Sequence, residues 1–137
     1  MGYGAILGKE WFVSTWSTAQ MPLSIAYKEL FPVVLAASLL GHQWSAKRVE
    51  FHSDNTAMVE VLRSGTSKDS NMIVLLRHLS MLAALHSFAF TASHVAGSSN
   101  SVADALSRFD FQRFRRLVPQ AAWYSKPLNQ DNGQVVE

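Results

Sequence analysis

The sequence predicts a single α/β domain in which helices flank a mixed β-sheet. Three observations predict this class: a hydrophobic fraction of 48% in 137 residues, an alternation of strand-like and helix-like apolar patterns, and the absence of an internal repeat. A chain of this length and apolar content can bury one compact core. Strands that alternate with amphipathic helices are typical of a sheet covered by helices.

The N-terminal third of the sequence predicts a hairpin followed by a long helix. Apolar runs at residues 3–7 and 11–16 flank a glycine-containing turn, which is the pattern of two antiparallel strands. Apolar residues then recur at helical spacing over residues 25–44. Pro32 lies inside this stretch, where a proline removes one hydrogen bond and clashes with the preceding turn, at a cost of about 3 kcal/mol. We therefore expect either a kink at Pro32 or a regular helix that begins near Leu30.

The rest of the chain alternates between strand and helix patterns. We expect a strand at residues 48–52, a helix at 56–63, a long amphipathic helix from 69 or 70 to 85, a strand at 88–94 and a helix at about 101–108. Either Asp54 or Asn55 is a suitable N-cap for the helix at 56–63. Past Phe114 the pattern fades and prolines recur. The expected domain is therefore 1–114, with a loosely ordered tail at 115–137.

The composition excludes several classes of protein. The chain has no cysteine, which rules out disulfides, thiolate metal sites and thiol nucleophiles. The net charge of +2 permits an anionic partner without requiring one. The longest apolar run, residues 30–40, is about half the length of a membrane span. No basic segment followed by an apolar stretch begins the chain. We expect no membrane association and an intracellular location, in the cytoplasm or nucleus.

Three carboxylates lie in apolar sequence surroundings. Glu29 is in the first helix, Asp54 follows a strand of buried type, and Asp104 is flanked by apolar residues in the last helix. Clustered carboxylates repel one another unless cations neutralise them. Oxygen ligands without cysteine favour Mg²⁺ or Mn²⁺ over zinc. Each residue also has a simpler interpretation: Glu29 as a solvated side chain, Asp54 as an N-cap, and Asp104 as an exposed position of an amphipathic helix.

Four segments carry a resemblance to a known family. They are GYGAIL at residues 2–7, KELFPVV at 28–34, FHSDN at 51–55 and HVAGSSNSVADALSR at 94–108. With these segments the chain resembles the ribonuclease H domain of gypsy-like and DIRS-type retroelement reverse transcriptases. The resemblance covers residues 2–114, and the last segment is its most specific part. It implies a ribonuclease H-like fold, a mixed sheet flanked by helices.

The resemblance also implies a chemistry. Family members hydrolyse the RNA strand of an RNA–DNA hybrid with two Mg²⁺ (or Mn²⁺) ions about 3.5–4 Å apart, one activating water and one stabilising the leaving oxygen. By match to the motifs, Glu29, Asp54 and Asp104 are the metal ligands. His94 matches a mobile histidine that assists proton transfer or product release. The implied partners are the hybrid and the remainder of a reverse transcriptase polyprotein.

One departure from the family pattern affects both catalysis and folding. The family begins with a strand that carries a catalytic aspartate, whereas no acidic residue precedes Glu10 here. We therefore expect weakened metal binding and an inactive isolated chain. The absent strand is central in the family, between the hairpin and the strand at 48–52. Its loss leaves strand edges that favour self-association, since each buried unpaired backbone group costs about 1–3 kcal/mol.

Four explanations for this gap remain open: upstream residues, a strand from another copy, the tail segment 121–125, or a hairpin that pairs directly with the strand at 48–52. Pro127 limits any strand in the tail. A shortened or fragmentary chain is the simplest of these expectations.

Several further residues are candidates for nucleic-acid contact. Four arginines are interleaved with Phe109, Phe111 and Phe114 near the end of the expected domain. They either bind phosphate, which suits the guanidinium group, or simply end an amphipathic helix whose aromatic residues pack on the core. The candidates for nucleic-acid contact are Asn55, Asn100, Arg108, Arg113, Arg115 and Arg116. Two functions follow: a hybrid-cleaving enzyme domain, or an inactive derivative that binds nucleic acid or oligomerises.

Overall fold

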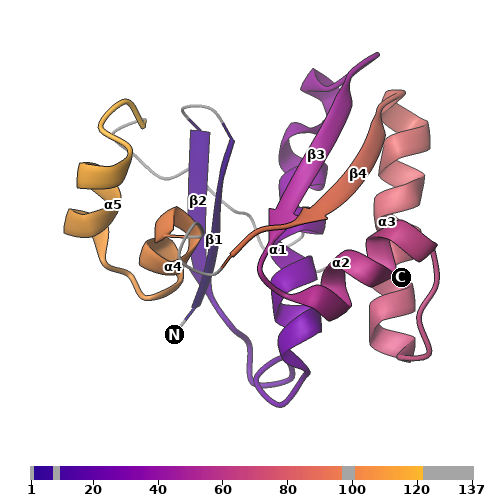
Figure 1. The fold of residues 1–137 in the computed structure, drawn as a ribbon, viewed down its shortest axis with the longest axis horizontal. Helices are drawn as coiled ribbons and strands as arrows, with labels where there is room; N and C mark the ends of the chain where they lie inside the picture. Colours follow the sequence, from indigo (N-terminus) through magenta and orange to yellow (C-terminus); the bar gives the residue numbers. More distant parts are fainter. Residues whose placement is uncertain (1, 8–9, 97–100, 122–137) are drawn as a thin grey trace.

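The structure, a computed structural model, describes residues 2–7, 10–96 and 101–121. It confirms the α/β class and contains all the predicted helices and strands, together with a 3₁₀ turn and a last helix that the sequence did not predict (Figure 1). They are β1 (Gly2–Leu7), β2 (Glu10–Thr15), α1 (Ile25–Leu40), a 3₁₀ turn η1 (Gly41–Gln43), β3 (Arg48–Ser53), α2 (Thr56–Ser64), α3 (Ser70–His86), β4 (Ala89–His94), α4 (Ser101–Ser107) and α5 (Phe111–Leu117).

The strands do not form the single mixed sheet that the sequence predicts. Within the described residues, β1 pairs antiparallel with β2, and β3 pairs parallel with β4, in two separate two-stranded sheets. In Figure 1 the hairpin and the β3–β4 pair lie side by side, with β1 on the side toward β3 and α1 behind the β3–β4 pair. The predicted alternative in which the hairpin pairs directly with residues 48–52 is not observed in these ranges.

Helix α1 packs against the hairpin and shares the main hydrophobic core with β3 and β4. Its N-cap is Ser24, whose hydroxyl accepts a hydrogen bond from the Tyr27 amide at 3.1 Å. The helix begins at Ile25 and continues through the buried Pro32, so it does not begin near Leu30. Tight packing of the surrounding apolar residues offsets the cost of the proline in this position. Regular helix ends at Leu40 and the 3₁₀ turn follows, four residues before the predicted end.

The hairpin separates two clusters of buried side chains. Side chains alternate between the two faces of a strand. On one face Tyr3 packs against Phe31 of α1, with ring centroids 5.3 Å apart. On the other face Trp11 packs against Phe114 of α5, with centroids 4.8 Å apart. The hairpin is thus covered on one side by α1 and on the other by α4 and α5, as Figure 1 shows.

The parallel pair β3–β4 has one buried and one exposed face. Phe51 is directly opposite Ala92, and both are buried against the helices. His52 and Glu50 point to the other face and are exposed. Parallel pairing brings the C-terminal ends of β3 and β4 together, because both strands run in the same direction.

The second cluster includes residues beyond the domain end expected at residue 114. It contains buried side chains from the hairpin, α4, α5 and the segment after α5: Trp11, Ala105, Leu106, Phe114, Val118 and Ala121. Asp110 caps α5 by accepting a hydrogen bond from the Arg113 amide at 3.1 Å. Phe114 within α5 and Val118 just after it are therefore part of the core. Of the predicted tail segment 121–125, the structure describes only Ala121, which is buried in this cluster.

By length and composition alone, one helical stretch among the described residues, Ile25–Gln43, is long and apolar enough to cross a membrane. It is the core helix α1 with its 3₁₀ extension, and half of it is buried inside the protein. The absence of a membrane partner remains a prediction from the sequence.

Candidate functional site

Two of the predicted metal ligands lie together where β3 ends beside α1. Asp54 follows β3 directly, while Glu29 is in the second turn of α1. The buried hydroxyl of Ser53 hydrogen-bonds the Glu29 carboxyl, and the charge on Asp54 acts on that carboxyl as well. Ser53 also accepts a hydrogen bond from the Asn55 amide at 3.1 Å. The structure thus brings Glu29, Ser53 and Asp54 into one polar group.

The pKa of Glu29 is raised above its ordinary value. Burial of the carboxyl is the main cause, repulsion by Asp54 adds to it, and the hydrogen bond from Ser53 opposes it. Lys28 does not compensate for the buried charge, because its Nζ donates to the Met21 carbonyl oxygen at 2.7 Å. A cation beside Glu29 and Asp54 would stabilise the charged form of the buried Glu29 carboxyl and would reduce the repulsion between the two carboxylates.

The Asp54 side chain does not cap a helix. Asn55 is the N-cap of α2, and its Oδ1 accepts a hydrogen bond from the Met58 amide at 2.9 Å. Asp54 is exposed at the end of the strand. The simpler interpretation of Asp54 as a cap is therefore wrong, and its carboxylate is not occupied by that role.

His94 lies beside this group at the end of the neighbouring strand. It is the last residue of β4 and the Cα partner of Ser53, and the Val95 amide donates to the Ser53 carbonyl at 2.9 Å. The His94 side chain is exposed. The parallel register therefore places the His94 backbone beside Ser53, the last residue of β3, which directly precedes Asp54.

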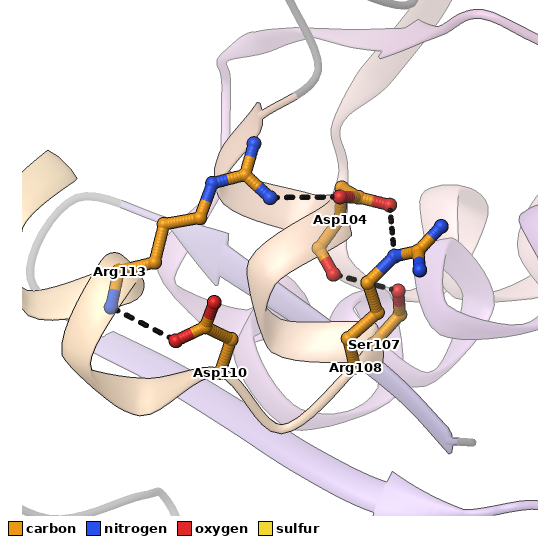
Figure 2. Close-up of polar contacts among 5 residues, drawn as sticks. All are labelled: Asp104, Ser107, Arg108, Asp110 and Arg113. Atoms are coloured by element: carbon orange, nitrogen blue, oxygen red, sulfur yellow. Dashed lines mark hydrogen bonds and ion pairs between the residues drawn. The ribbon is translucent and has the colours of Figure 1, made fainter.

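Asp104 is held in a different environment (Figure 2). Arg108 Nε lies 3.0 Å from Asp104 Oδ1, and Arg113 Nη1 lies 2.9 Å from Asp104 Oδ2. These two hydrogen bonds hold the pKa of Asp104 below its ordinary value. Within the described residues no group of three histidines or carboxylates gathers to hold a metal ion. The predicted third ligand is therefore not assembled with Glu29 and Asp54.

The donor set fits a divalent cation only in part. Glu29 and Asp54 supply oxygen atoms of the type that Mg²⁺ and Mn²⁺ prefer. Two carboxylates are a partial set for a two-ion site, and Asp104 is neutralised by arginines instead. The described residues are thus compatible with one weakly held ion at Glu29 and Asp54, and they do not assemble a complete two-ion centre.

The other predicted nucleic-acid contacts have mixed environments. Arg108 and Arg113 bind Asp104, while Arg115 donates to the Ala121 carbonyl at 2.7 Å and lies over the Trp11 ring. Arg116 is exposed on α5. Asn55 uses its side-chain oxygen as an N-cap. Asn100 lies outside the described residues.

Sequence reasoning did not assign two roles that the structure shows. Ser53 is the buried residue that positions Glu29, and its only signal is its place before Asp54 at the end of a buried strand. The pair Asp104–Arg108 has the i,i+4 spacing of a helical ion pair, so the sequence could have predicted it. Arg113 is nine residues from Asp104, and the turn between α4 and α5 brings them together.

No protein-family model, curated protein or solved structure matches this chain. The fold and the site define an α/β protein with two small sheets and a carboxylate pair at the end of a parallel strand pair. Its function must be inferred from these residues.

Proposed function

We propose that this chain is a ribonuclease H-like domain of a retroelement reverse transcriptase, whose family activity is metal-dependent hydrolysis of the RNA strand of RNA–DNA hybrids. The Glu29–Asp54 pair carries the proposal. These two carboxylates repel each other, one of them is half-buried, and they lie where the resemblance implies metal ligands. His94 at the adjacent strand end supports the same assignment.

We further propose that cleavage is impaired in this chain. Asp104, the third implied ligand, forms ion pairs with Arg108 and Arg113. Removing one member of a catalytic group that acts as a unit usually costs most of the activity. The alternative function is a catalytically inactive module that binds nucleic acid or oligomerises. The ion pairs of Asp104 with two arginines, and the separation of the strands into two sheets, favour this alternative over an efficient enzyme.

A metal titration tests the site itself. Paramagnetic Mn²⁺ added to the isotope-labelled chain is expected to broaden the NMR signals of residues 53–55 and of the second turn of α1. Asp54→Asn should weaken this effect, whereas Glu60→Gln, an exposed residue of α2, should leave it unchanged. Broadening that is spread evenly over the surface, or that is the same in the Asp54→Asn variant, would argue against a metal site here.

Hybrid binding and cleavage test the activity class. The chain is expected to bind an RNA–DNA hybrid more tightly than a DNA duplex of the same sequence, and to cleave the hybrid weakly or not at all in Mg²⁺. Robust cleavage that Asp54→Asn abolishes would support the enzyme and overturn the proposed impairment. Equal binding of both duplexes, together with no localised Mn²⁺ effect, would overturn the proposed function.

A further inference from the structure

The net charge of the chain is concentrated in one segment. Residues 101–121 contain four arginines and two aspartates, so their formal charge of +2 equals that of the whole chain. The remaining residues therefore carry equal numbers of basic and acidic side chains. A positive field confined to one side attracts an anionic partner to that side. Figure 1 shows α4 and α5 grouped at the hairpin end of the molecule, away from α2 and α3.

A shallow surface pocket lies on α5 within this segment. Its lining is Phe111, Gln112, Arg115 and Arg116. Phe111 and Arg115 are four residues apart, as are Gln112 and Arg116, so the four side chains occupy two neighbouring stripes of the helix. The buried Phe114 and Val118 hold the other side of α5 against the hairpin. The pocket is therefore presented outward by a helix that is anchored in the core.

The lining combines an aromatic ring with positive charge. The Phe111 side chain is 42% exposed, although it is a large apolar group. The Trp11 ring, with its centroid 6.0 Å away, supports it from the core side. Arg116 is exposed beside it, and its guanidinium has no hydrogen bond or ion pair with the part of the chain that the structure describes. An exposed aromatic ring next to an available guanidinium is the arrangement that binds unpaired bases and their phosphates.

We infer that α5 is a binding surface for single-stranded nucleic acid, with one base stacked on Phe111 and a phosphate bound by Arg116. Gln112, with a donor and an acceptor on its amide, can hydrogen-bond a base edge. A single strand fits better than a duplex, because only an unpaired base offers its face for stacking. The inference takes the class of partner from the proposed function, but it concerns a surface that is separate from Glu29 and Asp54.

Binding to a fluorescent oligonucleotide of about 10 nucleotides, measured by anisotropy in EDTA, tests this inference. Phe111→Leu keeps an apolar side chain but removes stacking, so it should weaken binding about fivefold or more. Phe111→Trp should retain the affinity. Arg116→Gln should weaken binding and also reduce the slope of log affinity against log salt by about 0.7, because one phosphate contact is lost. Phe111→Leu should leave that slope unchanged.

The control variant is Arg77→Gln, which removes an exposed charge from α3, and it should bind like the unmodified chain. Unchanged affinity in both Phe111→Leu and Arg116→Gln would overturn the inference. Equal binding of a polyglutamate peptide would also overturn it, because the surface would then select charge alone. EDTA removes metal-dependent cleavage, so this assay can fail or succeed independently of the proposed ribonuclease H activity.

A hybrid with and without a single-stranded overhang separates the two sites further. The overhang should increase affinity in the unmodified chain and lose that effect in Phe111→Leu. An overhang that adds the same affinity to both proteins would contradict a role for Phe111.

Discussion

Glu29 is the residue at which fold and function conflict most directly. Its carboxyl is partly buried among apolar side chains of α1, next to a second carboxylate. Such a position lowers the stability of the fold when the group is charged. Ser53 offsets only part of this effect through its hydrogen bond. A carboxyl that lowers the stability of the fold in this way is most simply explained by a functional role for the carboxylate, such as the metal binding proposed above.

The raised pKa of Glu29 gives a pH-dependent prediction. Between the ordinary pKa and the raised one, the folded state binds more protons than the unfolded state, so stability falls as pH rises through this window. Glu29→Gln removes this component. The variant should therefore gain stability relative to the unmodified chain as the pH is raised from about 4 to 7, a window set by the ordinary carboxyl pKa.

Urea unfolding at a series of pH values measures this effect. Glu60→Gln on the exposed face of α2 is the control, and its stability relative to the unmodified chain should vary little with pH. Parallel pH profiles for the unmodified chain and Glu29→Gln would show that the carboxyl is well solvated.

Individual residues also show what the sequence could and could not predict. Apolar spacing predicted the helices and strands well, because that spacing is a local property. The predicted group Glu29, Asp54 and Asp104 was only partly found, because the partner of Asp104 depends on the turn that brings Arg113 back to α4. Pairing between strands is equally non-local. The sequence therefore predicted β3 and β4 without showing that β1 and β3 belong to separate sheets.

At the scale of elements, α5 depends on a single deeply buried ring. Phe114 is fully buried between α4 and the hairpin, where it contacts Trp11. Its neighbour Leu117 is 43% exposed on the same helix. The two side chains have similar chemistry and very different burial, so they provide a matched comparison.

Phe114→Ala should destabilise the protein by about 3–5 kcal/mol, as expected for truncation of a buried aromatic residue. Leu117→Ala should change the stability by less than about 0.5 kcal/mol. Urea unfolding measures both, and hydrogen exchange should show faster exchange of the α5 amides in Phe114→Ala. Similar losses for the two variants would mean that the buried Phe114 ring stabilises α5 no more than an exposed side chain of the same helix does, since alanine itself favours the helix.

At the scale of the whole molecule, the two sheets share α1 but no backbone hydrogen bonds within the described residues. Among those residues, β1 and β3 each pair along one edge only. Unpaired strand edges are templates for pairing with another chain. The separation of the two sheets therefore bears on both proposals, the impaired cleavage and a tendency of the chain to associate with a second copy.

Sedimentation velocity over a concentration series is expected to show species larger than the monomer. The amides of β3 should then exchange with deuterium more slowly at high concentration, because pairing with a second chain protects them. A monomer at every concentration, with exchange independent of dilution, would mean that the edges are satisfied within one chain.

The two-sided packing of the hairpin has a consequence for synthesis on the ribosome. The partners that cover the Trp11 face of the hairpin, from Ala105 to Val118, are made more than ninety residues after Trp11. At about 5–20 residues per second, this face stays uncovered for roughly 5–20 seconds. The hairpin is thus synthesised well before the residues that complete its contacts. Protection of the nascent chain during that interval should affect how much protein reaches the native state.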